Sequence, residues 1–261
     1  MKILIATGLY PPDIGGPASH TRLLETHLPA YGYEVSVLAF SRVRHLPKGV
    51  RHIAYFIHCL RLGRAMDALY AQDPVSVGLP ALCAATLLGK PFFLRLGGDY
   101  AWEQGRLRFG VTDTLSEFTC AKKRHPCAVR LLRRIQTYVA SRAKRISVQS
   151  AFMKDVVTRW GIPEEKIVVI PNGFDGAEMT ENKQTARDAL ALSGTIGVSA
   201  ARLVPWKGFG ALIGIVPDII KKIPDFVLYI IGDGPEEKLL KDTVVTAGLT
   251  EHVIFTGRLE K

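Results

Sequence analysis

The chain has 261 residues, of which 48% are hydrophobic and 22% are charged, values that are ordinary for a globular protein and exclude a disordered one. The length allows two α/β domains or one large domain. The net charge of +10 is uneven, since residues 1–150 hold 21 Lys and Arg against 9 Asp and Glu, whereas residues 151–261 hold 13 against 15. The first half is therefore expected to attract nucleic acid, an anionic membrane or a phosphorylated substrate.

The cysteines form neither a paired CxxC zinc motif nor a dense disulfide framework, which favours reduced thiols in a cytoplasmic protein. Cys120, His125 and Cys127 offer three ligands, but no fourth lies nearby and the basic residues 122–124 repel a cation, so no metal is expected. The longest uncharged run, 74–89, is shorter than the roughly 20 residues of a membrane-spanning helix. We therefore expect no transmembrane anchor.

Apolar runs alternate with helix-compatible stretches through the first 170 residues. Strands are expected at 2–7, 34–39, 68–71, 91–96, 145–149 and 166–170. Helices are expected at 18–31, 77–88, 127–142 and 151–160. Continuous apolar runs are typical of strands buried on both faces of a parallel sheet. The pattern predicts a doubly wound α/β domain over 1–170.

A polar, loop-like stretch over 171–195 begins with the turn signal Pro171-Asn172-Gly173 and is interpreted as a domain linker. A second series then follows, with strands at 196–201, 226–231 and 252–256 and helices at 207–222 and 235–247. Three strands make half of a doubly wound domain. We expect a second domain over 196–261 that is incomplete, with a naturally small domain as the alternative.

A glycine-rich turn separates the first strand from the first helix. Gly15 and Gly16 allow the main chain to approach a ligand closely, and the helix N-terminus behind them favours an anion. The segment is not the GxGxxG fingerprint, which weakens the case for a nicotinamide-dependent dehydrogenase. A tight turn without a ligand is the structural alternative.

Five segments, taken in order, resemble glycosyltransferase family 4. They are AKRISVQS at 143–150, WGIPEEKI at 160–167, IPNGFD at 170–175, ARLVPWKGF at 201–209 and IGDGP at 231–235. The resemblance covers nearly the whole chain. It implies a retaining enzyme of the GT-B fold, with two Rossmann-like domains and with donor and acceptor meeting between an N-terminal acceptor domain and a C-terminal donor domain. It implies a nucleotide-sugar donor and no metal or other cofactor.

Two basic residues match the need of this chemistry for fixed positive charge on the leaving diphosphate. Arg202 and Lys207 lie five apart in the loop that leaves the first strand of the second domain. By resemblance they bind the donor diphosphate, and Gly15 and Gly16 present backbone N–H groups to the same diphosphate or to the acceptor. Two solvated surface cations are the alternative for Arg202 and Lys207.

Further candidates for substrate contact lie in two turns. Gly232 and Gly234 follow a strand of the second domain, and Asn172 and Gly173 open the linker. Turns of this kind are common for geometric reasons alone. A structural role in the turn or in the hinge is therefore the alternative for all four residues.

The segment at 97–103 departs from the family pattern. Many members place a histidine in this loop, whereas this chain has Gly97, Gly98 and Asp99. Asp99 is the candidate catalytic residue, orienting an acceptor hydroxyl or acting as its base, with a loop-stabilising aspartate as the alternative. The pair of glutamates by which the family holds the donor would lie beyond Lys261, so part of the donor site is expected to be missing.

Residues 122–145 contain nine Lys or Arg residues and no acid. Apolar residues recur there at helical spacing, namely Leu131, Leu132, Ile135 and Val139. An apolar side beside a cationic side is typical of helices that bind anionic membrane surfaces, here near a lipid-linked acceptor. A core-packed helix with solvated arginines is the alternative. Tyr138 is the one aromatic residue in the stretch, which disfavours a nucleic-acid interface.

The sequence thus favours an enzyme that moves a sugar from a nucleotide-sugar donor to a glycan or lipid-linked acceptor. We expect it in the cytoplasm, with the inner face of the membrane as a site of peripheral binding. A non-catalytic remnant that retains acceptor binding is the second hypothesis. An NAD-dependent oxidoreductase is the third and the least favoured.

Overall fold

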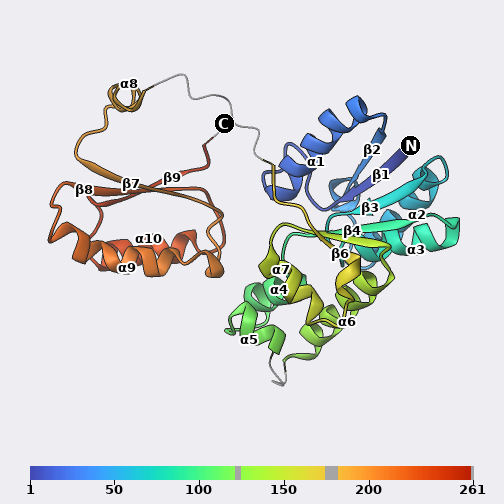
Figure 1. The fold of residues 1–261 in the computed structure, drawn as a ribbon. Coiled ribbons are helices and arrows are strands. Elements are labelled where there is room, and N and C mark those ends of the chain that lie inside the picture. The colour runs from blue at the N-terminus through green and yellow to red at the C-terminus, as the bar shows by residue number, and fades with distance from the viewer. Residues whose placement is uncertain (121–124, 174–181, 260–261) are drawn as a thin grey trace. The chain divides into compact units, whose positions relative to one another are not determined.

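The computed structural model describes residues 1–120, 125–173 and 182–259. The chain forms two compact units, Met1–Phe174 (unit 1) and Asp175–Lys261 (unit 2), and each contains a parallel sheet with helices (Figure 1). The predicted α/β class is confirmed. The boundary between the units falls inside the stretch 171–195 that was interpreted as the linker.

Unit 1 is built on six parallel strands in the order β2-β1-β3-β4-β5-β6. Their bounds are β1 Lys2–Thr7, β2 Glu34–Ala39, β3 Ala68–Ala71, β4 Phe92–Leu96, β5 Arg145–Val148 and β6 Ile167–Val169. The predicted strands at 2–7, 34–39 and 68–71 have the same limits in the structure. The other three differ from prediction by one or two residues.

Helices cover both faces of this sheet. Their bounds are α1 Gly16–His27, α2 Val50–Gly63, α3 Gly78–Leu88, α4 Tyr100–Arg108, α5 Leu115–Cys120, α6 Cys127–Arg142 and α7 Ala151–Thr158, with 3-10 segments at Leu28–Tyr31, Phe40–Val43 and Glu164–Lys166. The step from β1 to β2 runs opposite to every later step across the sheet. Because such crossovers are right-handed, α1 lies on one face, and α2, α3, α6 and α7 lie on the other (Figure 1).

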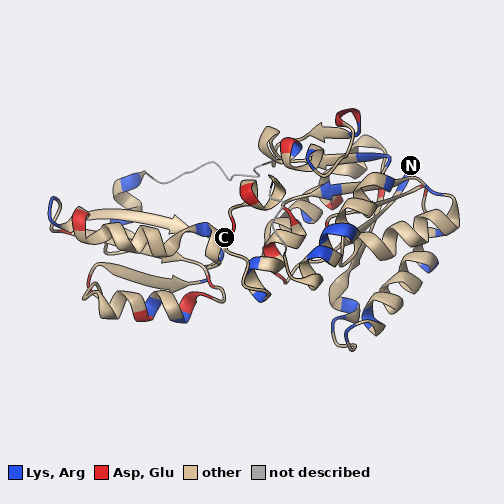
Figure 2. Cartoon of the chain, turned by 90° about the horizontal axis from the view of Figure 1, so that it is seen from below, with Lys and Arg blue, Asp and Glu red and all other residues tan. Residues whose placement is uncertain are grey.

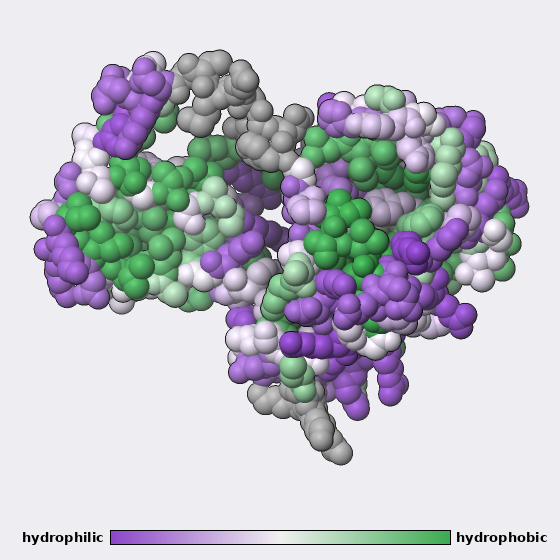
Figure 3. Space-filling view, viewed as in Figure 1, coloured by the Kyte–Doolittle hydropathy of each residue, from purple (hydrophilic) through white to green (hydrophobic). Residues whose placement is uncertain are grey.

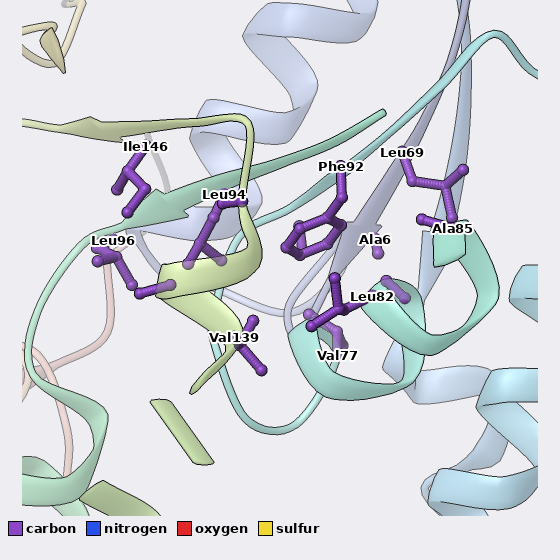
Figure 4. Packing of buried hydrophobic residues seen from close by; sticks show 14 of the residues in the cluster. Ala6, Leu69, Val77, Leu82, Ala85, Phe92, Leu94, Leu96, Val139 and Ile146 are labelled. Atoms are coloured by element: carbon purple, nitrogen blue, oxygen red, sulfur yellow. The ribbon is translucent and has the colours of Figure 1, made fainter. Parts of the chain in front are cut away.

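The main core of unit 1 lies between the sheet and these four helices. Phe92 and Leu94 of β4 point toward Val77 and Leu82 at the start of α3 and toward Val139 of α6 (Figure 4). Burying an apolar side chain of this size contributes about 1.5–3 kcal/mol. The core therefore fixes which face of each strand meets the helices.

Helix α2 was not expected from the sequence. Tyr55 and Cys59 are buried one turn apart, and the Tyr55 hydroxyl donates to the carbonyl oxygen of Leu38 at 2.7 Å. Ile53 and Ile57 lie on the same helix but are exposed. Apolar residues on both sides of the helix conceal the 3.6-residue period by which an amphipathic helix is recognised. Helices α4 and α5 were also not expected.

Unit 2 contains three parallel strands in the order β7-β8-β9. Its elements are α8 Lys183–Ala189, β7 Thr195–Ala200, α9 Phe209–Ile220, β8 Phe226–Ile231, α10 Glu237–Thr246 and β9 Val253–Gly257, with a 3-10 turn at Pro205–Lys207. Helix α8 corrects the prediction of a loop throughout the linker. The Asn182 side chain caps it by accepting from the Thr185 N–H at 2.9 Å.

One face of the unit 2 sheet packs against helices α9 and α10. Leu228 and Ile230 of β8 are buried there together with Ile213 of α9. Val198 and Ile254 are in register with Tyr229 between them, so they point to the opposite face, where Val198 is 63% exposed. Broad hydrophobic areas are visible on the surface of unit 2 (Figure 3).

Backbone hydrogen bonds join the loops after β7 and β8. The Leu203 N–H donates to the Asp233 carbonyl oxygen at 2.8 Å, and the Glu236 N–H donates to the Leu203 carbonyl oxygen at 3.2 Å. A Cβ atom on Gly234 would lie 2.2 Å from that same Leu203 oxygen. Gly232 has a φ of +129°, a backbone conformation that residues with a side chain rarely adopt. This packing supports the structural alternative for Gly232 and Gly234.

Replacing Gly234 with alanine is expected to destabilise unit 2 by about 1–3 kcal/mol, because the new methyl group overlaps a backbone oxygen that cannot move freely. Gly214→Ala is the matched control, since Gly214 lies in α9 with nothing within 4 Å of an added Cβ. That change is expected to stabilise the helix by up to about 1 kcal/mol. Urea unfolding followed by tryptophan fluorescence measures both, and equal stability of the two variants would contradict the packing argument.

Candidate functional site

The carboxyl ends of β1 and β3 mark the point in unit 1 where the strand order reverses. The chain leaves β1 toward one side of the sheet and leaves β3 toward the other. Open α/β sheets bind ligands at such a switch point. The loop that ends at Gly15 follows β1, and Gln72 and Asp73 follow β3 directly. These loops therefore border the position where the fold of unit 1 favours a ligand.

The predicted glycine-rich turn leads into helix α1. Gly15 is its N-cap with a φ of +157°, and a Cβ atom there would lie 3.0 Å from Leu9 Cδ1. A Cβ atom on Gly16 would have nothing within 4 Å. No side chain caps α1, so the first-turn N–H groups lack the partner that a capping residue would supply. The turn is thus both tight at Gly15 and open at Gly16.

Asp73 closes the turn that follows β3. Its Oδ1 accepts from the N–H groups of Val75 at 2.8 Å and Ser76 at 2.6 Å. Burial raises the pKa of the carboxyl to about 6, against these hydrogen bonds, which lower it. Asp73 also lies beside Gly8, where an added Cβ would come within 3.3 Å of Asp73 Oδ2. This residue was not expected from the sequence.

Asp99 is buried, with 1% of its surface exposed, and it caps helix α4. Its Oδ1 accepts from the Trp102 N–H at 2.9 Å and from Gln136 Nε2 at 3.0 Å. Gln136 of α6 in turn accepts from the Ala101 N–H at 2.9 Å. Burial raises the pKa of Asp99, while the bonds from Trp102 and Gln136 lower it. This geometry favours the loop-stabilising alternative over contact with an acceptor.

Asn172 is engaged with a residue of the sheet. Its Oδ1 accepts from the Arg95 guanidinium at 2.6 Å, which ties the end of unit 1 to strand β4. An added Cβ on Gly173 would meet nothing within 4 Å. The structure therefore gives Asn172 a structural partner and leaves Gly173 open.

Arg202 and Lys207 are both exposed at the carboxyl end of β7. In the described part of the chain neither side chain forms an ion pair. The nearby Asp233 is paired instead with Arg258, at 2.6 Å between Oδ2 and Nε. Two exposed cations thus lie beside the backbone hydrogen bonds that join the two loops. Gly234 borders a cavity of about 430 Å³ on the same unit.

The predicted site residues fall into two groups by unit. Gly15, Gly16, Asp99, Asn172 and Gly173 belong to unit 1. The unit 2 group consists of Arg202, Lys207, Gly232 and Gly234. Each group gathers at the carboxyl edge of its own sheet. That the two groups hold one diphosphate stays a prediction.

Three residues of the unit 1 edge were missed as site candidates: Gln72, Asp73 and Arg95. Gln72 and Asp73 have no recognisable motif around them. Arg95 did leave a signal, because it is a charged residue inside the apolar run FFLRL of β4. A charge in a strand expected to be buried on both faces needs a partner.

The predicted membrane-docking stretch 122–145 is described from residue 125 onward, and Lys122, Lys123 and Arg124 lie outside the described residues. Helix α6 buries Val139 in the core, as the core-packed alternative requires, but Leu131 is 57% exposed. Lys and Arg positions are spread over the helices, strands and loops of unit 1 (Figure 2). The exposed side of α6, here called the α6 outer face, comprises Arg130, Leu131, Arg134, Tyr138 and Arg142.

Within the described residues, no three His, Cys, Asp or Glu side chains converge as metal ligands. His125 instead pairs with Asp113, at 2.9 Å between Nε2 and Oδ2. None of the described helices has the length and apolar character needed to cross a bilayer.

Two family models match the chain. The model described as "Glycosyl transferase 4-like domain" matches residues 38–173, and the one described as "Glycosyl transferases group 1" matches residues 182–261. The first covers more than half of the chain and most of unit 1. The second covers the described part of unit 2.

Two curated proteins match shorter segments of the chain. One subunit of the phosphatidylinositol N-acetylglucosaminyltransferase of Homo sapiens is 30% identical over 115 residues, which is 44% of this chain and 23% of that protein. A GDP-mannose-dependent monoacylated alpha-(1-6)-phosphatidylinositol monomannoside mannosyltransferase of Corynebacterium glutamicum is 36% identical over 97 residues, 35% of this chain and 25% of that protein. The matches thus span about a quarter of each relative's length.

A solved structure supports the architecture along the whole chain. Anabaena Alr3699/HepE in complex with UDP and glucose aligns with a TM-score of 0.68 at 18% identity, covering 100% of this chain and 70% of that one. At this identity the likeness shows the fold, which is of the GT-B type, as the resemblance implied. Together with the match over residues 38–173, this places the chain in the glycosyl transferase 4-like family.

Proposed function

We propose that the protein transfers a sugar, with retention, from a nucleotide-sugar donor to a glycan or lipid-linked acceptor. The observation that carries the proposal is the loop after β7, where Arg202 and Lys207 are exposed and form no ion pair with any described acidic residue. Negative charge builds on a nucleoside diphosphate as it leaves, and cations fixed nearby stabilise it. The Anabaena neighbour, whose crystals contain UDP and glucose, supports a donor of this class.

Each unit is proposed to bind a different substrate. Unit 2 binds the donor diphosphate through Arg202 and Lys207, and no metal is required because these cations supply the positive charge. Unit 1 binds the acceptor, with Gly15 and Gly16 contributing backbone N–H groups to a diphosphate or to the acceptor. The two curated relatives are named for transfer to phosphatidylinositol and to one of its mannosides, which supports an acceptor with a lipid anchor.

Two other functions remain as rivals. A non-catalytic protein that binds only an acceptor is one rival, but it would give no role to Arg202 and Lys207 of unit 2. An NAD-dependent oxidoreductase is disfavoured by the turn after β1, which lacks the GxGxxG spacing. Titration with nicotinamide cofactor addresses the latter directly.

A donor screen tests the proposal. The full-length protein is incubated with a panel of nucleotide sugars, with and without phosphatidylinositol-containing vesicles, and release of nucleoside diphosphate is measured. We expect release from one donor class and faster release with acceptor present. If no donor gives any release, the transferase assignment fails.

Replacing Arg202 or Lys207 with alanine is expected to lower turnover with the active donor by about 10²–10³-fold each, as loss of a group that stabilises transition-state charge does. Lys222→Ala is the matched control, since Lys222 is an exposed lysine of the same unit that follows the C-terminal end of α9. It should leave turnover unchanged. Equal rates in all three variants would remove Arg202 and Lys207 from the donor site.

For Asp99 we propose a positioning role through the cap of α4. Asn caps a helix as well as Asp, so Asp99→Asn should keep stability and hold turnover within about threefold. Asp99→Ala removes the acceptor of both Trp102 and Gln136 and should cost about 2–4 kcal/mol in the free energy of unfolding. A fall in turnover of about 10²–10⁴-fold in Asp99→Asn at unchanged stability is what a catalytic base predicts instead.

We further propose that the α6 outer face docks on anionic lipid. Each basic residue near such a surface contributes about 1 kcal/mol, so Arg130→Gln with Arg134→Gln should weaken vesicle binding about 30-fold. Arg61→Gln with Arg64→Gln, two exposed arginines at the C-terminal end of α2, is the control of equal charge. Co-sedimentation with vesicles containing phosphatidylglycerol measures both. Vesicle binding that does not depend on the content of anionic lipid, or that falls equally in both double variants, would refute docking through α6.

A further inference from the structure

Arg95 is a buried cation in the middle of an apolar strand. It lies on β4 between Leu94 and Leu96, both fully buried, and only 8% of its own surface is exposed. Burial lowers the pKa of its guanidinium from the usual value, which nevertheless leaves an arginine charged. The strand therefore carries a positive charge that is mostly removed from water.

No carboxylate compensates this charge within residues 1–120, 125–173 and 182–259. The one hydrogen bond of the guanidinium within these residues goes to the neutral side-chain oxygen of Asn172, at 2.6 Å. Tyr70 of β3 is a titratable neighbour, and its hydroxyl lies 3.4 Å from Ser147 Oγ. All of these partners are uncharged at neutral pH.

Among the described residues, His20 of α1 is a second titratable group whose pKa depends on the charge of Arg95. Burial and then the charge of Arg95 lower the pKa of His20 to about 4, so its ring is neutral at physiological pH. Helix α1 and strand β3 thus each present an uncharged group to a single buried positive charge. Buried charges in proteins are normally paired, because taking an unpaired ion out of water is costly.

Gln72 is a buried polar residue at the same edge. It is 4% exposed, and among the described residues neither Oε1 nor Nε2 of its side chain has a hydrogen-bond partner. It follows Ala71, which is paired with Leu94, the residue before Arg95. Buried amides are usually satisfied, so an orphaned one calls for an explanation. Gln72, directly after β3, therefore continues the register opposite Arg95 of β4. Among the described residues the Gln72 amide has no hydrogen-bond partner, and the Arg95 guanidinium has a neutral one but no counter-charge.

We propose that Arg95 and Gln72 form a phosphate-binding site in unit 1, close to the uncapped N-terminus of α1. A phosphate or diphosphate would supply both the counter-charge for the guanidinium and an acceptor for the Gln72 amide N–H groups. Arginine matches phosphate oxygens with paired N–H donors, and a water-poor setting strengthens such bonds. Unit 1 would then recognise the charged part of a substrate rather than its sugar alone.

Two sources can provide this group: the diphosphate of a nucleotide donor, or the phosphate of a lipid-linked acceptor. That the ligand is a substrate rests on the proposed function, whereas phosphate binding itself does not. A purely structural role, in which Arg95 only holds Asn172, is the competing account. Asn172 is exposed and could hydrogen-bond water instead, so this account gives no reason for a buried charge.

The test measures binding of inorganic pyrophosphate by calorimetry to the full chain carrying Arg202→Ala and Lys207→Ala, so that the diphosphate site proposed for unit 2 does not contribute. This double variant is the parent protein for the comparisons that follow. Arg95→Met keeps the length of the side chain and removes its charge, and it is expected to weaken binding about 30-fold. Arg95→Lys keeps a charge without the paired donors and should retain part of the affinity. Arg145→Met is the matched control, because Arg145 lies exposed on β5 in register with Phe93 of β4, and it should change binding less than about threefold.

Thermal unfolding without ligand distinguishes a phosphate-binding role of Arg95 from a purely structural one, in which Arg95 only holds Asn172. Removing an unpaired buried charge should leave the melting temperature of Arg95→Met equal to or above that of the parent protein. A lower melting temperature with unchanged pyrophosphate binding would establish a purely structural role for Arg95 and overturn the proposal. Absence of pyrophosphate binding by the parent protein would overturn it as well.

Two further titrations identify the source of the phosphate. UDP and GDP represent the donor, and glycerophosphoinositol represents the head group of a lipid acceptor. The ligand whose binding is lost in Arg95→Met but kept in Arg145→Met is the one that the site takes, and loss of neither would refute the site. Because no turnover is measured, these results stand apart from the donor screen, and failure of one does not imply failure of the other.

Discussion

Every strand pair in both sheets is parallel, so all strands of a unit end at the same edge. That edge collects the loops that follow each strand, however distant they are in the sequence. In unit 1 it brings the turn at Gly15, the residues after β3 and the Asp99 cap onto one sheet, and in unit 2 it joins the loops after β7 and β8. The candidate residues of each unit are therefore neighbours because of strand direction, before any side chain is considered.

Main-chain packing then holds the loops in place, and this explains why several candidates have structural tasks. Gly232 and Gly234 leave room for the carbonyl groups of Ala201 and Leu203, on either side of Arg202. Asp99 plays the corresponding part in unit 1 by capping α4. Such supporting residues determine where the exposed cations and open N–H groups of a site lie, although they need not touch a substrate.

Sequence patterns predicted the strands at 2–7 and 68–71 closely because each is a continuous apolar run that is followed by a glycine or a polar residue, Gly8 and Gln72. Helix α2 escaped prediction because its apolar residues lie on two sides, as Tyr55 and Ile53 illustrate. The loop of Asp99 was placed correctly at the carboxyl end of β4, but its side chain turns inward, and the direction of a side chain depends on tertiary packing. That Arg95 has no counter-ion among the described residues is likewise visible only once its neighbours from α1, β3 and β5 are in place.

The positive charge of the first half of the chain therefore consists of two physically different kinds of cation. The arginines of the α6 outer face are solvated, so salt screens their attraction for an anionic surface, and each contributes little alone. Arg95 is buried, so salt screens it far less, and its orientation is fixed by Asn172 and the strand. The first kind suits attraction to an extended surface, whereas the second suits recognition of one phosphate group. Within one unit, separate basic residues can thus attract a substrate to the protein surface and recognise its phosphate group.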